Sequence, residues 1–260
     1  MNRRWLALLV VGAVLLVPGV AFAAAPAAGA AAAGGGLNIS LSGGGMFTDR
    51  VMQIVALITI LSIAPSILIM MTSFVRIVVV LSLLRTAMGV QTSPPNSVII
   101  SLSLFLTLFV MTPTLTAAYN QGIAPLMAEK ITTEQAFDRT TAPMKQFMLA
   151  HVREADLKLF LDMSHAKPPA TPDQVALTTL APAFMLSELK RAFEIGFLIF
   201  VPFLIIDMAV ASILMSMGMM MLPPVIISLP FKLIFFVLVD GWRLIAGSLV
   251  ASYMHSPPPT

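Results

Sequence analysis

Charged residues are scarce in this 260-residue chain, and cysteine is absent. Asp, Glu, Lys and Arg make up 10% of the sequence, whereas an ordinary soluble domain carries about 25%. Hydrophobic residues make up 58%, so their surplus must face lipid or other subunits, which predicts an integral membrane protein. Without cysteine, neither a disulfide nor a thiolate metal site is available. The net charge of +3 is too small and too dispersed for a nucleic-acid surface.

The sequence motifs of common catalytic sites are also missing. The three histidines, His151, His165 and His255, are scattered without metal-ligand spacing. There is no glycine-rich phosphate loop, nucleophile elbow or zinc-protease helix motif. With so few polar groups an enzyme is not expected, and no catalytic residue, cofactor site or metal site is predicted.

The first 23 residues have the pattern of a secretory signal peptide. A basic start, MNRR, precedes an apolar run that ends in Ala21-Phe22-Ala23. This ending is typical of cleavage after Ala23, with an uncleaved anchor as the alternative. Residues 24–45 are an Ala/Gly linker without the periodicity of a buried element. We therefore expect a mature N-terminus outside the cytoplasm and a chain located in a bacterial inner membrane.

Four long apolar stretches predict an all-α membrane fold. They cover residues 51–84, 97–113, 193–221 and 225–250. The first would be about 50 Å long as a single helix, so it is either one kinked helix or two shorter ones. We expect two long helical hairpins, residues 46–113 and 183–254, on either side of a small insertion, residues 114–182, with a tail at 255–260. The prolines and charges in these stretches would equally suit burial against other proteins.

The insertion has an ordinary polar composition and is predicted to be helical and periplasmic. Thr132 and Gln135 are spaced as a capping box at a helix start. Pro143 is expected in the first turn of an amphipathic helix over residues 143–164.

Charges in or beside the apolar stretches are expected to be paired, because an isolated charge is costly there. Several lie three or four residues apart and can pair on one helix: Glu188–Arg191, Lys190–Glu194, Arg191–Glu194 and Asp240–Arg243. Asp207 has no opposite charge within a turn, and we expect Arg76 of another helix to be its partner. A proton or ion relay is the alternative, but it would need unpaired acids. The residues assigned to structural pairing are Arg76, Glu188, Lys190, Arg191, Glu194, Asp207, Lys232, Asp240 and Arg243.

Methionine is concentrated just before a proline pair. Six of the 14 residues from Met208 to Met221 are Met, and Pro223 and Pro224 follow. The three consecutive side chains of Met219, Met220 and Met221 cannot share one helix face, so at least one should leave the packing interface. Adaptable helix packing is the ordinary interpretation. If several copies formed a ring, these tips would converge as a pliant apolar collar that resists water and ions.

Long blocks of the sequence resemble the FliP family of flagellar export-gate proteins. The blocks are PAFMLSELKRAFEIGF (182–197), PFLIIDMAVASILMSMGMMMLPP (202–224) and LPFKLIFFVLVDGW (229–242). TSFVRIVVVLSLLRTAMG and PPNSVIISLSLFLTLFVMTP, within residues 72–113, are similar to the family's first hairpin. The resemblance extends over roughly residues 46 to 253. Injectisome members share much of this pattern, and the leader before the first hairpin is more similar to the flagellar branch.

The resemblance implies a subunit of the type III protein export apparatus. Several copies would form a homo-oligomer with FliQ-type and FliR-type subunits, beside other export components of the flagellar basal body, and unfolded flagellar proteins would pass through the gate. The family's methionine-rich loop falls on Met219, Met220 and Met221. A small-solute or ion transporter that uses Asp207 and Glu194 is the alternative function, and an intramembrane enzyme is the weakest.

Overall fold

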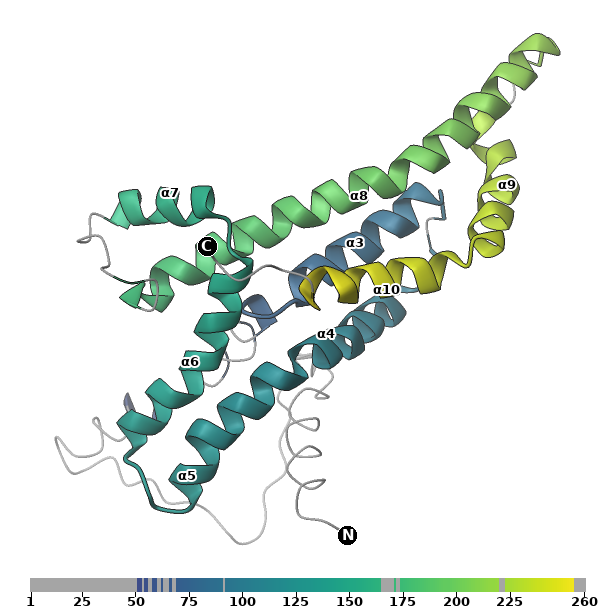
Figure 1. Cartoon of the computed structure of the whole chain (residues 1–260). Helices are drawn as coiled ribbons and strands as arrows, with labels where there is room; N and C mark the ends of the chain where they lie inside the picture. Colours follow the sequence, from purple (N-terminus) through teal and green to yellow (C-terminus); the bar gives the residue numbers. More distant parts are fainter. Residues whose placement is uncertain are drawn as a thin grey trace, which may run out of the picture. The chain divides into compact units, whose positions relative to one another are not determined.

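The computed structural model describes residues 69–254 apart from Gln91, 165–170, 172–173 and 220–222, together with a few positions between 51 and 66. The predicted signal peptide, the Ala/Gly linker, the tail, His165 and His255 lie outside the described residues. The chain divides into two units, residues 1–67 and 68–260. The described positions of the first unit are helical, and the second unit holds helices α3 to α10 (Figure 1).

Helix α3, Phe74–Ala87, is the central helix of the second unit. It begins after a turn at residues 71–73, so the long stretch 51–84 is interrupted by that turn. Its buried positions recur at helical spacing and supply a large part of the core: Ile77, Val80, Leu81, Leu84 and Ala87. Gly89, with φ +77°, follows its end in a left-handed conformation that glycine adopts without strain.

Helix α4, Asn96–Ala118, follows the Pro94-Pro95 turn and packs against α3. It continues through Pro113, where the first hairpin was predicted to end, into a π-helix at Tyr119–Ile123 and a short helix α5 at Ala124–Met127. Its buried Ser103 and Thr107 each donate to the carbonyl four residues earlier, at 2.7 Å. These hydroxyls are therefore satisfied within the helix, which allows them to face the core.

The polar insertion forms two helices, α6 at Thr133–His151 and α7 at Glu154–Ser164. The capping box of Thr132 and Gln135 is confirmed, because each side chain bonds the other residue's backbone amide. The expectation that one helix over 143–164 starts at Pro143 was wrong, since Pro143 lies inside α6. The helix breaks after His151 because the Arg153 amide donates to the side chain of Ser187 on α8, at 3.0 Å.

Helix α8, Leu177–Ser216, has 40 residues and is about 60 Å long. Figure 1 shows it alongside α3. The two helices pack tightly at Gly196, where an added Cβ would lie 2.3 Å from Leu83 Cδ1. Arg76 bonds Glu188 further toward both N-termini, so α3 and α8 run parallel.

The last apolar stretch, 225–250, is not one straight helix. Helix α9 spans Pro224–Leu238 and α10 spans Gly241–Met254, and the two are bent by 61°. Asp240, at φ 51°, makes the bend. Aspartate is one of the few residues that visit the left-handed region, because its short polar side chain bonds locally.

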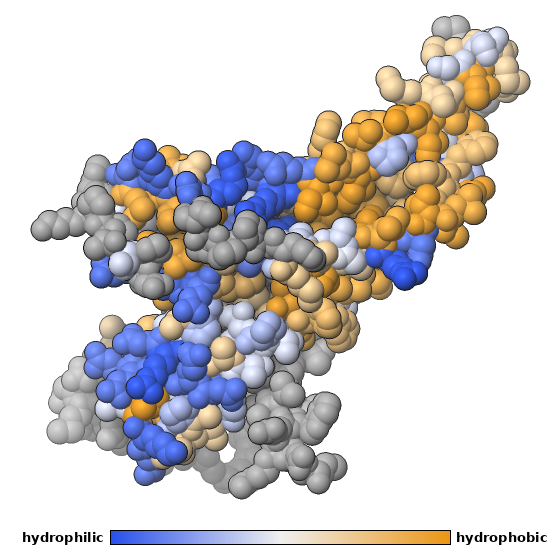
Figure 2. Space-filling view, in the orientation of Figure 1, coloured by the Kyte–Doolittle hydropathy of each residue, from blue (hydrophilic) through white to orange (hydrophobic). Residues whose placement is uncertain are grey.

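Much of the apolar surface of the second unit is uncovered. Figure 2 shows hydrophobic residues over the C-terminal half of α8 and over α9 and α10. Polar residues lie over α6 and α7. Among the described residues, the helical runs Asn96–Met127 and Leu177–Ser216 are long and apolar enough to cross a membrane, and the bent α9–α10 pair would make a third span. All regular elements of the described part are helices.

Candidate functional site

The methionine-rich end of α8 is closed by a glycine-capped turn. The amide of Gly218 donates to the carbonyl of Met215 at 3.1 Å, and that of Met219 to the carbonyl of Leu214 at 3.0 Å. Gly218 has a φ of +76°, and together these features make a Schellman motif. Pro224 occupies the first turn of α9, where a missing amide donor costs nothing. The sequence thus stops one helix and starts the next within a short tip.

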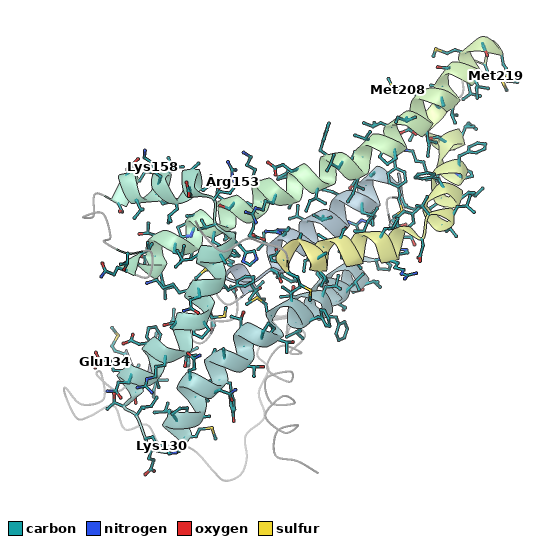
Figure 3. All side chains as sticks on the ribbon, in the orientation of Figure 1. Lys130, Glu134, Arg153, Lys158, Met208 and Met219 are labelled. Carbon is teal, nitrogen blue, oxygen red and sulfur yellow. The ribbon has the colours of Figure 1, made fainter. Side chains whose placement is uncertain are left out.

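The methionines of this tip face away from the core. Met215, Met217 and Met219 are 58%, 66% and 43% exposed. Figure 3 shows Met219 at the tip just beyond the end of α8 and Met208 further back on that helix. Met220 and Met221 lie outside the described residues. The described thioethers are therefore available to a partner surface or to a conduit.

A buried ion pair joins α8 to α9 behind the tip. Lys232 Nζ lies 2.6 Å from Asp207 Oδ2 and 3.4 Å from the carbonyl oxygen of Ala87. Ser228 of α9 donates to the other carboxylate oxygen of Asp207. Lys232 is buried, and its ammonium group therefore holds together α8, α9 and the end of α3.

The expected pairing of Asp207 with Arg76 was wrong. Asp207 is engaged by Lys232, near the end of α3, whereas Arg76 lies roughly 16 Å further back along that helix. Asp207 and Lys232 had both been assigned to charge pairing. The sequence does not show which helices pack together or how far each is shifted along its neighbour. Lys232 is the one basic residue within α9. This isolation is the sequence feature that could have indicated it as the partner of Asp207.

A second buried network surrounds Arg76. Its guanidinium pairs with Glu188 of α8, and its Nη1 donates to Ser252 Oγ at 3.1 Å. The other carboxylate oxygen of Glu188 accepts from the Tyr253 hydroxyl. Arg76 also stacks over the Tyr253 ring, 4.0 Å from its centroid. Arg76 and Glu188 are fully buried, and the network that joins α3, α8 and α10 gives both charges polar partners in place of water. Arg76 Nε is left without a hydrogen-bond partner among the described residues.

His151 borders this network from α6. Its ring lies 5.1 Å from the Tyr253 ring, and its Nδ1 donates to the Phe147 carbonyl at 2.7 Å. A carbonyl only accepts, so the proton of the neutral ring sits on Nδ1. Nε2 has no hydrogen-bond partner within the described part of the chain. Burial lowers the pKa of His151, and the nearby Arg76 adds to that effect against the opposing influence of Glu188 and of the backbone carbonyl.

The remaining predicted pairs lie on the surface. Lys190–Glu194 and Asp240–Arg243 are each 3.9 Å apart and solvent-exposed, so they contribute little. Arg191 has no carboxylate within 4.0 Å among the described residues, because Glu188 turns to Arg76 instead. The predicted pairs Glu188–Arg191 and Arg191–Glu194 are therefore not formed.

A polar junction between α7 and α8 was not predicted from the sequence. Ser187 Oγ donates to Asp156 Oδ2 at 2.7 Å and accepts from the Arg153 amide. Arg153 also pairs with Asp156 at 3.6 Å. Only the spacing of Arg153 and Asp156 was visible in the sequence, since Ser187 comes from a distant helix.

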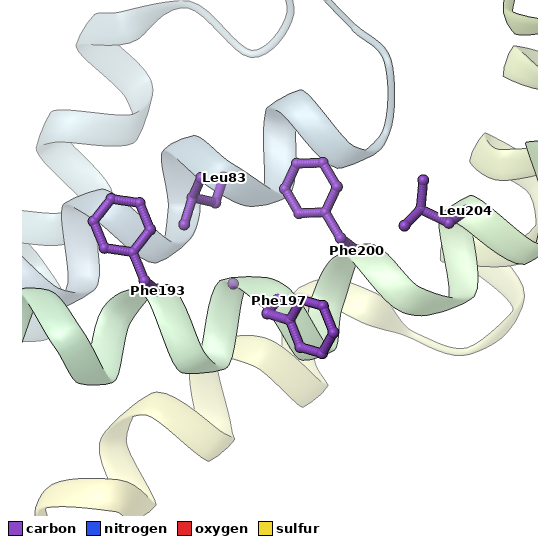
Figure 4. Close-up of a pocket in the computed structure, with 6 residues that line it drawn as sticks. Leu83, Phe193, Phe197, Phe200 and Leu204 are labelled. Carbon is purple, nitrogen blue, oxygen red and sulfur yellow. The ribbon is translucent and has the colours of Figure 1, made fainter.

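An apolar groove lies between α3 and α8 (Figure 4). It is lined by Leu83, Phe193, Gly196, Phe197, Phe200 and Leu204. No lining side chain can orient a polar substrate or move a proton. Within the described ranges, no group of three or more His, Asp or Glu side chains is placed to hold a metal ion.

Long apolar helices, buried ion pairs between them and a broad uncovered apolar surface define a helical membrane protein. The FliP family model matches residues 57–249, and the chain belongs to the FliP family. It is 62% identical over 219 residues to the flagellar biosynthetic protein FliP of Caulobacter vibrioides. The aligned region covers 84% of this chain and 82% of the relative. The protein of that name from Bacillus subtilis is 51% identical, and the match covers 84% of this chain and 98% of the relative. The one from Aquifex aeolicus is 50% identical, over 81% of this chain and 89% of the relative.

Proposed function

We propose that the chain is a pore-forming subunit of the flagellar type III protein export apparatus. Several copies assemble with FliQ-type and FliR-type subunits in the inner membrane part of the flagellar basal body, after cleavage of the signal peptide. Unfolded flagellar proteins pass through the oligomer. Met219, Met220 and Met221 form an apolar collar that seals the conduit to ions while it is idle.

The observation that carries this proposal is the tip of α8. Exposed thioethers sit on a glycine-capped turn, and Lys232 fixes the helices behind them. A flexible apolar ring on a rigid support can exclude water and still reshape around chains of varied sequence. The uncovered apolar surface of α8, α9 and α10 supports extensive contacts with lipid or other subunits.

The same geometry weakens the transporter alternative. Asp207 is paired with Lys232 and accepts from Ser228, and Glu194 lies on the surface. A relay needs acids that are free to take up and release protons. A transporter should purify as a small oligomer of one chain, whereas an export gate should form a large complex that depends on its partners. The mass of the detergent-extracted complex, with and without co-expressed partners, separates the two.

The seal is tested by alanine substitution of Met219, Met220 and Met221 together. Alanine shortens each side chain and widens the constriction, so ion leak through membranes that contain the assembled apparatus should rise while complex assembly is retained. Alanine at Met127 and Met163, which are exposed in the polar region, is the matched control and should leave the leak unchanged. Unchanged conductance in the assembled tip variant would contradict the proposed seal.

A further inference from the structure

The structure holds two kinds of methionine. Met111 and Met148 are 0% exposed and packed between helices. Met215, Met217 and Met219 instead expose about half of their side chains within one short tip. The described part of the chain therefore leaves the tip thioethers uncovered, whereas the surrounding helices shield Met111 and Met148.

Exposed thioethers react with hydrogen peroxide. The sulfur attacks one peroxide oxygen, so that an S–O bond forms and the O–O bond breaks. The departing hydroxide then takes the proton of the new S–OH group, which leaves the sulfoxide and one water molecule. The sulfur is oxidised by two electrons and the peroxide is reduced. The product, methionine sulfoxide, is polar and chiral, and methionine sulfoxide reductases return it to the thioether.

We propose that Met215, Met217 and Met219 form a site of reversible oxidation by peroxide, at which sulfoxide formation makes the idle conduit leak ions. This inference rests on the proposed function, because it requires the tip to act as an apolar seal. A constriction that excludes ions by staying dry loses that property when strong hydrogen-bond acceptors line it. Oxidation then converts the seal into a hydrated opening.

The fold around the tip tolerates this modification. Among the described residues, nothing lies within 4 Å of a Cβ added at Gly218. The Schellman hydrogen bonds are made by the backbone, and the Asp207–Lys232 pair contains no thioether. Because the side chains of Met215, Met217 and Met219 are exposed, a sulfoxide oxygen on them changes the hydration of the tip and leaves these hydrogen bonds in place.

The first test locates the modification. Membranes containing the assembled apparatus are treated with hydrogen peroxide, and peptides of the full chain are weighed for the gain of about 16 Da that each sulfoxide adds. The tip methionines should be oxidised well before Met111 and Met148. Oxidation of the tip at the slow rate of these two buried methionines would overturn the proposal.

The second test links oxidation to leak. Peroxide should raise the ion leak of wild-type membranes several-fold, and treatment with both methionine sulfoxide reductases should reverse the rise. Leucine at residues 215, 217 and 219, combined with leucine at the two methionines that follow Met219 in the sequence, keeps the tip apolar and should abolish the response. Leucine at Met127 and Met163 is the control and should respond like wild type. A response that persists in the tip variant would overturn the proposal.

The two proposals fail separately. If alanine at the tip raises the leak but peroxide does not, the oxidation site is refuted and the seal stands. If neither treatment changes the leak of an assembled complex, the seal itself is refuted, and the oxidation proposal with it.

Discussion

Lys232 of α9 lies 2.6 Å from Asp207 of α8 and also bonds the last turn of α3. One buried ammonium group thereby fixes three helices behind the methionine tip. Many side chains of α8 are exposed in this region, but Phe203 and Leu214 are buried, and Phe203 packs against the ring of Phe235 on α9. The pair therefore adds a polar restraint on the position of the tip to this apolar packing.

Replacing Asp207 with alanine should destabilise the protein strongly, because it leaves the buried Lys232 charge without a partner. Removing one member of a buried pair costs about 3–5 kcal/mol, and the partial exposure of Asp207 places the loss toward the lower end. The thermal unfolding midpoint in detergent measures it. Replacing both residues together, Asp207→Ala with Lys232→Met, should recover much of the loss.

Glu194→Ala provides the matched control for this pair. Glu194 pairs with Lys190 at 3.9 Å on the surface, so its loss should cost about 1 kcal/mol or less. If Asp207→Ala were as mild as Glu194→Ala, the buried pair would not be a restraint on the tip.

The sequence predicted the kinds of interaction better than their geometry. Apolar periodicity gave the all-helical class, and the capping box at Thr132 was correct because it depends on residues three apart. The partner of Asp207 was wrong because pairing between helices depends on how far each has shifted along its neighbour. The break after His151 depends on Ser187, 34 residues beyond Arg153. Local spacing carries no information on such contacts.

Tyr253→Phe should destabilise the junction of α3, α8 and α10. The Tyr253 hydroxyl donates to the buried carboxylate of Glu188, and a hydrogen bond to a charged group contributes about 1.5–3 kcal/mol. Phenylalanine keeps the ring under Arg76, so the change isolates the hydroxyl. Thermal unfolding in detergent measures the loss. Tyr119→Phe, at the other tyrosine of the chain, which is exposed, should change little.

Gly122→Ala should be among the most damaging alanine substitutions at glycine. An added Cβ would lie 2.8 Å from the Thr140 amide nitrogen and 2.9 Å from the Ala136 carbonyl oxygen. Because these are backbone atoms of α6, they cannot turn aside, and overpacking of this kind costs about 1–3 kcal/mol or more. The expected result is a lower unfolding midpoint with partial separation of the π-helix from α6.

Gly247→Ala is the control for this effect. Gly247 sits inside α10, and no atom of the described part of the chain lies within 4 Å of a Cβ added there. Alanine has the higher helix propensity, so this variant should be neutral or more stable by up to about 1 kcal/mol. Equal losses in the two variants would contradict the close approach of the π-helix to α6.

Acidification should destabilise the protein through His151. Its folded-state pKa lies below the ordinary value of about 6.5 because burial disfavours the imidazolium. The unfolded chain then binds a proton more readily than the folded one, so stability is highest above pH ~6.5 and falls as the pH drops toward the folded-state pKa. Arg76, Glu188 and Tyr253 face the ring or act on it, and the carboxylate of Glu188 reduces the loss but does not cancel it.

His151→Gln isolates this contribution, because glutamine cannot take up the proton. Unfolding midpoints of the two proteins should be compared from pH ~7.5 down to pH ~5, the range in which histidine titrates. The wild type should lose stability relative to the variant as the pH falls, by about 1.4 kcal/mol for each unit that separates the two pKa values of His151. Parallel curves for the two proteins would mean that His151 is not held neutral by burial, and a relative gain for the wild type in acid would mean that Glu188 stabilises its charged form.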